Sequence, residues 1–290
     1  MALWQAYDLQ AKLKANKIAS ELKIIKTKGD KIQDLSFDKI EGKGFFTKEI
    51  EDELIAKKID VAVHSLKDLP TQSPQGLVIA GLSERQDPAD LLIIDKAAVD
   101  MANDLRLKQG AIVGTSSVRR QSIAKDLASH ITIKELRGNV PTRIEKLKSG
   151  SYDAIILASA GINRLEIDLS DFRVIRLNPK EFIPAPGQGV IGYQVREDDI
   201  EMRKILSEIH NKSTAQMTNV ERKVLNLMDG GCHIPLGVYT EVDEQGFYHV
   251  WVSYAQSKDT KPVRINISQS TSHGLAENIV DQLTKFIENQ

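Results

Sequence analysis

The sequence predicts an α/β protein of more than one domain that ends in a small α+β module. Three observations lead to this prediction. The chain has 290 residues, enough for about two domains or three small ones. Short β-rich runs alternate with amphipathic segments through the first two-thirds of the chain. After a helical stretch at residues 213–228 the order changes to three β-rich runs and a final helix.

The spacing of apolar residues predicts the first helices and strand of the chain. Residues 1–16 predict a helix whose apolar residues fall near one face: Leu3, Ala6, Tyr7, Ala11 and Leu13. Residues 21–26 alternate polar and apolar side chains and predict a strand. Residues 47–58 predict a charged helix with Ile50, Leu54 and Ile55 on its apolar face.

In the middle of the chain, predicted strands alternate with predicted helices. Short β-rich runs occur at residues 60–64, 77–82, 111–113, 131–136 and 153–158. Helices fit between them at residues 118–128 and 142–148. This order predicts parallel sheets covered by helices on both faces, with ligands bound beyond the carboxyl ends of the strands.

Two segments interrupt this alternation. Residues 29–44 form a long, polar, glycine-punctuated stretch, which is typical of either a functional lid or a floppy insertion. Residues 178–189 hold three prolines and two glycines and predict a rigid extended crossing between domains. The C-terminal module is predicted from β-rich runs at residues 235–242, 247–255 and 262–268 and an amphipathic helix at residues 275–287.

Composition excludes several classes of protein. Lys plus Arg number 39 and Asp plus Glu 40, so the net charge of −1 argues against a nucleic-acid binder and any basic site must be local. No apolar run approaches the ~18 residues of a membrane span, and no secretory signal is recognised at residues 1–16. The single cysteine, Cys232, excludes an intrachain disulfide and a multi-cysteine metal site, which favours a reducing cytoplasm.

The segment DVAVHSLKDLP at residues 60–70 is the first candidate site. A strand ends near His64, and Ser65, Lys67 and Asp68 follow in the loop beyond it, which Pro70 stiffens. A carboxylate there can act as a general acid or base, or can stabilise a developing cation. The alternative is an Asp68 that caps a helix or pairs with Lys67.

The segment IVGTSSVRRQ at residues 112–121 predicts an anion site. The hydroxyls of Thr115, Ser116 and Ser117 lie between a strand and a helix, where they can cap the helix and where its first N–H groups are free. Arg119 and Arg120 follow in the first turn and are suited to binding carboxylates. The alternative is a solvated arginine pair on a surface helix.

Three further arginines follow strand ends. Arg137 and Arg143 lie in ELRGNVPTR, with Pro141 where a helix would begin, and Arg164 follows the next strand. Five guanidiniums in one crevice predict a ligand with several carboxylates or phosphates. Any one of them alone is more often an ordinary surface residue.

Cys232 lies in GGCHIP, after paired glycines that end a helix. A helix C-terminus does not favour a thiolate, so its position does not make Cys232 a fast nucleophile. The usual role of a lone cysteine is that of a small buried hydrophobe, although a glycine-rich setting permits a covalent attachment.

Taken together, these motifs resemble one family. HSLKDLP, GTSSVRRQ, LRGNVPTR, YDAIILASAG, PAPGQG and GGCHIPLG occur in this order, and the chain resembles porphobilinogen deaminases from Ala2 to its end. The resemblance implies two doubly wound lobes like the halves of periplasmic binding proteins, plus a small C-terminal α+β domain with a three-stranded antiparallel sheet. It places the first domain at residues 1–84 and 189–208, the second at 88–184 and the third at 212–290.

The resemblance also implies the chemistry. Such a transferase joins four porphobilinogen molecules head to tail into the linear tetrapyrrole hydroxymethylbilane, releasing ammonia at each step. The growing chain is attached to a covalent dipyrromethane cofactor through a thioether to the cysteine that matches Cys232. The catalytic aspartate matches Asp68. The resemblance implies heme and porphyrin biosynthesis by a cytoplasmic monomer that needs no metal and binds neither nucleic acid nor membrane.

Further residues match the family's contact positions. The cofactor positions are Ser65, Lys67, Thr115, Ser116, Ser117, Arg119, Arg120, Arg137, Gly138 and Gln188, in addition to Cys232. The substrate positions are Arg143, Arg164, Lys43 and Lys48, of which the two lysines match the family's mobile cleft loop.

One departure from the family pattern raises alternatives. Family members carry a strand and an arginine-containing loop before the segment ALWQA, which here begins at Ala2. We therefore expect either a start upstream or a chain that folds and turns over poorly. The competing interpretations are a solute-binding protein of similar two-lobed shape and an inactive truncated paralogue.

Overall fold

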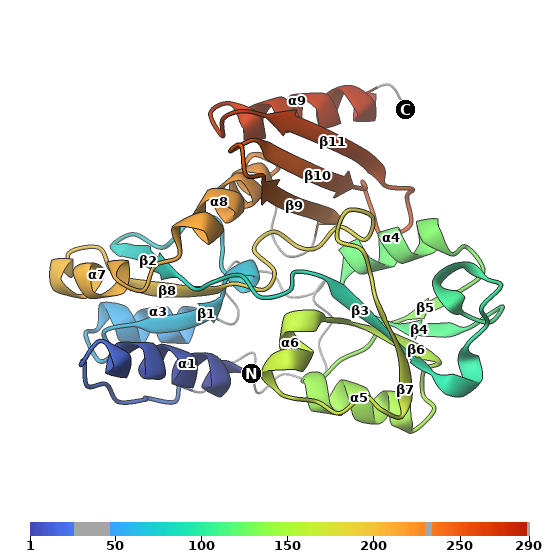
Figure 1. The fold of residues 1–290 in the computed structure, drawn as a ribbon, viewed down its shortest axis with the longest axis horizontal. Coiled ribbons are helices and arrows are strands. Elements are labelled where there is room, and N and C mark those ends of the chain that lie inside the picture. The colour runs from blue at the N-terminus through green and yellow to red at the C-terminus, as the bar shows by residue number, and fades with distance from the viewer. Residues whose placement is uncertain (26–46, 230–233, 289–290) are drawn as a thin grey trace. The chain divides into compact units, whose positions relative to one another are not determined.

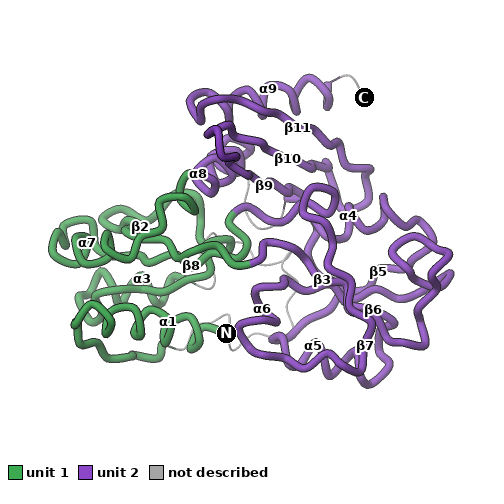
Figure 2. The backbone as a smooth tube through the Cα atoms, in the orientation of Figure 1, with its two compact units in different colours: residues 1–86, 187–216 green, residues 87–186, 217–290 purple. Residues whose placement is uncertain are grey.

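The computed structural model describes residues 1–25, 47–229 and 234–288 (Figure 1). The chain divides into two compact units (Figure 2). Unit 1 comprises residues 1–86 and 187–216, and unit 2 comprises residues 87–186 and 217–290. The chain therefore leaves unit 1 and later returns to it.

Unit 1 is built on a three-stranded sheet in the order β1-β8-β2. Its strands are β1 (Ala62–Ser65), β2 (Leu77–Leu82) and β8 (Ile191–Arg196), and its helices include α1 (Ala2–Ala15), α3 (Lys48–Ile55) and α7 (Ile200–Ser207). Helices α1 and α7 pack on the face that carries Tyr193, and α3 packs on the face that carries Ala62. Because side chains alternate along a strand, β8 contributes to both layers.

Unit 2 contains a five-stranded sheet in the order β5-β4-β6-β3-β7. Its strands are β3 (Asp90–Asp95), β4 (Ile112–Gly114), β5 (Thr132–Lys134), β6 (Ala154–Ala158) and β7 (Phe172–Arg176). Helix α4 (Val118–Leu127) packs on one face through Ile123, while α5 (Val140–Lys148) and α6 (Ser159–Arg164) pack on the other. Short 3₁₀ turns lie at Leu66–Asp68 in unit 1 and at Lys96–Ala98 and Asp104–Arg106 in unit 2.

Neither of these sheets is wholly parallel, whereas the sequence predicted parallel sheets. In unit 1 both strand pairs are antiparallel, because β8 runs opposite to β1 and β2. The sheet of unit 2 is mixed: β4 is parallel to β5 and β6, but β3 is antiparallel to β6 and β7. Strands β3 and β8 are the first strands that the chain forms after entering their units. Because no crossover helix within the same unit leads into them, they need not be parallel to their neighbours.

The C-terminal part of unit 2 is the predicted α+β module. Strands β9 (Leu236–Val242), β10 (Tyr248–Tyr254) and β11 (Val263–Gln269) form an antiparallel sheet in the order β11-β10-β9 (Figure 1). Helices α8 (Lys212–Leu227) and α9 (Leu275–Glu288) bury Val224, Leu275 and Ile279 against this sheet. The predicted α/β class with a three-stranded antiparallel C-terminal sheet is confirmed.

The two predictions for the start of the chain need correction. Residues 21–25 form no strand, and Ile24 is 70% exposed. Helix α1 buries Gln5, Leu9 and Leu13, whereas Tyr7 is 57% exposed. The buried face follows the spacing i, i+4, i+8 through a glutamine, which an apolar pattern does not reveal. Strands β3, β7 and β8 were not predicted.

The packing of β9 predicts one sensitive glycine. A Cβ atom at Gly237 would lie 2.5 Å from the carbonyl oxygen of Ile183, and the next residue, Val238, donates its N–H to the oxygen of Pro184. We expect Gly237→Ala to lower the free energy of unfolding in urea by about 1–3 kcal/mol, because backbone must move to make room. Glu244→Ala, at an exposed position between β9 and β10, is the control. A Gly237→Ala protein as stable as this control would contradict the prediction.

Candidate functional site

In unit 1, the loop after β1 presents Asp68 to solvent on a fixed backbone. Leu66 and Leu69 are buried on either side, while the Asp68 side chain is exposed. The N–H of Leu66 donates to the carbonyl of Val190 at 2.9 Å, and the N–H of Leu69 donates to the carbonyl of Leu66 at 3.2 Å. Two buried leucines thus anchor a carboxylate that remains accessible, as an acid–base group requires.

The segment that contains Gln188 packs against this loop. Gly187 has φ +74°, and a Cβ atom there would lie 3.0 Å from the Leu66 side chain. The backbone carbonyl of Gln188 accepts a hydrogen bond from Arg85 Nε at 3.1 Å. Glycine is needed at residue 187 both for its conformation and for this close approach. The PAPGQG motif therefore supports the Asp68 loop, and the Gln188 residue is buried with it.

A residue that the sequence did not reveal orients Ser65. Gln5 Nε2, on α1, donates to Ser65 Oγ at 2.8 Å, and Gln5 is buried. Because the amide fills an acceptor position of the hydroxyl, the Ser65 O–H remains available to donate to an anion. The signal that could have revealed Gln5 is its i, i+4, i+8 spacing with Leu9 and Leu13.

Beside Ser65, the buried side chain of His64 belongs to a chain of polar contacts. His64 Nε2 and Gln194 Oε1 are 3.2 Å apart, Gln194 Nε2 donates to Glu51 Oε1 at 3.0 Å, and Thr47 Oγ1 donates to Glu51 Oε2 at 3.2 Å. Burial lowers the pKa of His64 to about 4, against the opposing effect of the Gln194 contact. His64 is therefore neutral at pH 7 and joins the Asp68 loop to the start of α3.

In unit 2, the predicted strand–hydroxyl–helix motif has the expected local structure. Helix α4 begins at Val118, and the Ser117 hydroxyl accepts the N–H of Arg120 as the N-cap. Thr115 Oγ1 accepts the N–H of Ser117, and Ser116 Oγ exchanges hydrogen bonds with the backbone of Leu136. These hydroxyls fix the loop that precedes the arginine pair.

Arg119 and Arg120 are buried side chains rather than a solvated pair. Both share one carboxylate: Arg119 Nη2 lies 2.9 Å from Asp90 Oδ2, and Arg120 Nη2 lies 2.7 Å from Asp90 Oδ1. Asp90 is fully buried at the start of β3. The sequence analysis did not single out Asp90, because strand β3 itself was missed.

Two more predicted arginines adjoin this pair. Burial, followed by the charges of Arg120 and Arg137, lowers the pKa of Arg143 to about 10. Arg143 Nε donates to the carbonyl of Gly138 at 2.7 Å, and Arg137 lies 3.6 Å from Glu135. The charges of Arg120 and Arg137 thus act on Arg143 in addition to its burial, and positive charge gathers in this part of unit 2.

Gly138 has a conformational role. Its φ is +112°, and a Cβ atom there would lie 2.8 Å from the Thr142 side chain. Arg164, the fifth predicted arginine, is buried at the end of α6. Four of the five predicted guanidiniums are thus linked by direct contact or by charge within unit 2, and Gly138 shapes the loop that holds one of them.

The remaining predicted residues are less informative. Lys48 is exposed at the first position of α3, and Lys67 is half-buried beside Asp68. Lys43 and Cys232 lie outside the described residues.

Within residues 1–25, 47–229 and 234–288, no group of acidic, histidine or cysteine side chains could hold a metal ion. None of the helices described is both long and apolar enough to span a membrane.

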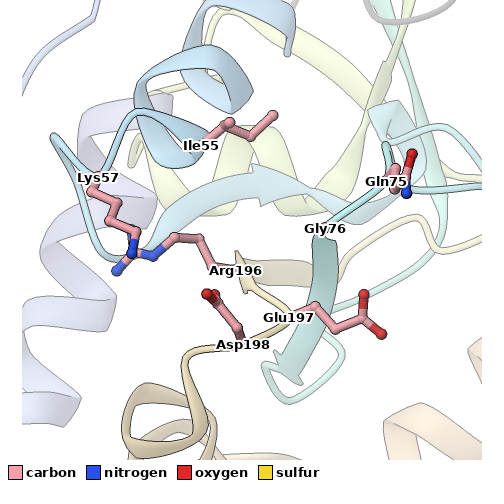
Figure 3. Close-up of a pocket in the computed structure, with 7 residues that line it drawn as sticks. All are labelled: Ile55, Lys57, Gln75, Gly76, Arg196, Glu197 and Asp198. Atoms are coloured by element: carbon pink, nitrogen blue, oxygen red, sulfur yellow. The ribbon is translucent and has the colours of Figure 1, made fainter.

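One hollow in unit 1, of about 480 Å³, contains none of the predicted residues (Figure 3). Its lining includes Lys57 and Arg196. The Arg196 guanidinium donates to the carbonyls of Leu54 and Ile59 and pairs with Asp60 and Asp199. These partners satisfy the arginine within the fold, so its charge is not available to an anion.

Comparisons with known proteins agree on one family. The family model described as porphobilinogen deaminase, dipyrromethane cofactor binding domain, matches residues 1–204, and that of the C-terminal domain matches residues 215–261. The chain belongs to the porphobilinogen deaminase family. It is 44% identical to the porphobilinogen deaminase of Helicobacter hepaticus, over 83% of this chain and 74% of the relative. It is 41% identical to that of Chlorobium phaeovibrioides, over 96% and 88%.

Among solved structures, a periplasmic binding protein of Salmonella typhimurium with high arginine specificity has a TM-score of 0.40 and 17% identity, over 73% of this chain and 83% of that one.

Porphobilinogen deaminases are transferases of tetrapyrrole biosynthesis, so the predicted enzyme class, pathway and dipyrromethane cofactor are confirmed by the family assignment.

Burial of neutral His64 predicts a dependence of stability on pH. The unfolded chain binds a proton at this residue near pH 6.5, but the folded enzyme binds it only near pH 4. The free energy of unfolding therefore falls as the pH drops from 6.5 to 4, by at most ~3 kcal/mol. Urea unfolding at pH 4.5 and pH 7 measures this loss.

We expect His64→Gln to show less of this loss, since glutamine does not titrate and can keep a hydrogen bond to Gln194. The exposed His273, changed to Gln, is the matched control. Equal pH dependence in the wild type and His64→Gln would show that another group is responsible.

Proposed function

We propose that this member of the porphobilinogen deaminase family holds the carboxylates of its pyrrole chain on the arginines of unit 2 and uses Asp68 of unit 1 for proton transfer. One observation supports carboxylate binding by these arginines: the buried Nε–H groups of Arg119 and Arg120 have no hydrogen-bond partner among the described residues. A buried donor without a partner is costly, and a ligand carboxylate would supply the missing acceptor.

The donor set fits a dipyrromethane with its substrate. Porphobilinogen carries one acetate and one propionate, so every ring brings two carboxylates. Arg119, Arg120, Arg137 and Arg143 provide planar guanidiniums that bind carboxylates by paired hydrogen bonds. When bound, the dipyrromethane supplies the terminal pyrrole ring to which substrate is joined. We assign its thioether attachment to Cys232, and further contacts with its carboxylates or with substrate to Arg164, Gln188, Lys43 and Lys48.

Asp68 has the properties of the acid–base group. It is exposed, its backbone is anchored by buried leucines, and it has no ion-pair partner in the described part of the chain. As a carboxylic acid it can donate a proton to the leaving amine, and as a carboxylate it can stabilise the positive charge that develops on substrate as ammonia departs. Ser65 and Lys67 flank it as hydrogen-bond donors to an anionic group.

The loop hydroxyls of unit 2 hold the arginines in place. Ser117 caps α4, and Thr115 and Ser116 fix the turn before it, so the guanidiniums need not be ordered when ligand arrives. Preorganised donors bind an anion at a smaller entropic cost than mobile ones. We assign Gly138 to the same supporting role through its carbonyl contact with Arg143.

We further infer a cytoplasmic monomer of three domains, with the boundaries predicted above. The single cysteine suits a reducing compartment, since a thioether anchor needs a thiol that stays reduced until it reacts. Light scattering of the purified enzyme measures its oligomeric state.

Asp68→Asn should abolish turnover without unfolding the enzyme. The amide keeps the shape of the exposed side chain but can neither lose nor deliver a proton, so we expect kcat to fall at least ~100-fold, within the usual range for general acid–base groups. Turnover is followed by colorimetric detection of product, and the melting temperature reports the fold. Asp52→Asn, an exposed carboxylate on α3, is the control. Wild-type turnover in Asp68→Asn would remove this residue from the mechanism.

Intact-mass spectrometry tests the proposed attachment site. The wild-type protein should exceed its sequence mass by one dipyrromethane, and Cys232→Ser should show the sequence mass alone, because a hydroxyl does not form the thioether. The colour reaction of the bound pyrrole rings with an aldehyde reagent should be lost in parallel. A fully active protein without any added mass would contradict the proposal.

A further inference from the structure

Asp90 links the two tandem arginines of unit 2 in an unusual way. Each of its oxygens accepts a hydrogen bond from a different guanidinium, at 2.9 Å from Arg119 and at 2.7 Å from Arg120. A carboxylate more often receives both donors of a single arginine. Asp90 has no exposed surface, and both arginines are buried, so water does not screen these contacts.

Helix geometry alone would not bring these two side chains together. Neighbouring residues of an α-helix point ~100° apart around its axis. Arg119 and Arg120 converge because β3 begins beside the first turn of α4 and offers one shared acceptor there. A second contact fixes each guanidinium: Arg119 Nη1 donates to the carbonyl of Ile183 at 2.8 Å, and Arg120 Nη1 to that of Ile156 at 3.1 Å.

Arg119 and Arg120 are left with the same unsatisfied group, the Nε–H. Each guanidinium uses one Nη1–H and one Nη2–H, and each Nε–H is buried with no partner among the described residues. One carboxylate also neutralises only one of the two positive charges. The pair therefore retains one net positive charge and two buried Nε–H groups without a partner among the described residues, which a ligand carboxylate could satisfy.

We propose that Asp90 is a positioning residue that holds Arg119 and Arg120 as a preformed site for one carboxylate of the pyrrole chain. This inference rests on the proposed function of the arginines, and it adds a residue that does not itself touch the ligand. The excess of positive charge extends to the next arginine, since the charge of Arg120 contributes to lowering the pKa of Arg143. Asp90 is thus the buried anion that keeps the guanidiniums close without cancelling their attraction for ligand.

The test compares three variants. Asp90→Asn keeps the shape but removes the charge, so the two guanidiniums repel and separate. Asp90→Glu keeps the charge but moves the carboxylate by one methylene. Asp95→Asn is the control, because Asp95 lies at the other end of β3 and its side chain accepts the N–H of Ala97, an interaction that an asparagine oxygen can keep. Each purified variant is measured for melting temperature, for the fraction that carries the dipyrromethane mass, and for kcat and KM of the loaded fraction.

We expect Asp90→Asn to lose more than half of its dipyrromethane loading. We expect KM for porphobilinogen to rise about tenfold in the loaded fraction of both Asp90 variants, equivalent to ~1.4 kcal/mol. The value of kcat should change less than KM, because the group that moves protons is untouched. Asp95→Asn should behave as the wild type.

A purely structural salt bridge gives a different result. In that case Asp90→Asn lowers the melting temperature, but the folded protein keeps full loading and wild-type KM, and the inference is overturned. If Asp90→Asn does not fold, Asp90→Glu decides: a raised KM supports positioning, and a wild-type KM overturns it.

A further pair of variants separates this inference from the proposed function. If Arg119→Gln and Arg120→Gln retain full loading and wild-type KM, the carboxylate-binding role of the arginines fails. If these variants are impaired while both Asp90 variants are not, only the inference about Asp90 fails.

Discussion

Buried positive charge is the constraint that governs unit 2. Arg119 and Arg120 are buried, Arg143 is partly buried, and Asp90 is the fully buried carboxylate that pairs with the first two. Burying a charge is costly unless a partner of opposite sign accompanies it. Under the proposed function, the carboxylates of the bound pyrrole chain supply further partners, so part of this cost falls only on the free protein. The fold contributes rigid support: a capped helix, a strand end and two backbone carbonyls hold the guanidiniums in place.

Unit 1 holds Asp68, the carboxylate to which we assign proton transfer, exposed on an anchored loop. The side chains that support the Asp68 loop are apolar or uncharged at neutral pH, namely Leu66, Leu69, neutral His64 and the buried amides of Gln5 and Gln194. The proposed function thereby divides between the two units. Asp68, the proposed acid–base group, belongs to unit 1, and the guanidiniums proposed to bind carboxylates belong to unit 2.

Elements that depend on neighbouring residues were predicted correctly, and strands that depend on distant parts of the chain were missed. The start of α4, its Ser117 cap and the Asn139 cap with Pro141 in the first turn of α5 depend on residues within a few positions of one another, and the observed helices begin at or near the predicted residues. The C-terminal sheet was predicted within about one residue at each strand start, since its strands follow one another along the chain. Strands β3 and β8 were missed because each enters its sheet from a distant part of the chain and is buried on both faces, so neither alternates clearly.

The sequence by itself determined the family, the α/β class and the arginines that follow strand ends, because these depend on ordered motifs and on local rules of capping and turn formation. Only the tertiary structure decided which partners those residues meet. Asp90 lies 30 positions from Arg120, and Gln5 lies 60 positions from Ser65, yet each pair is in hydrogen-bond contact. Contacts at such separations arise when sheets and helices pack, and no spacing along the chain encodes them. The sharing of one buried carboxylate by two neighbouring arginines therefore became visible only once β3 and α4 were placed side by side.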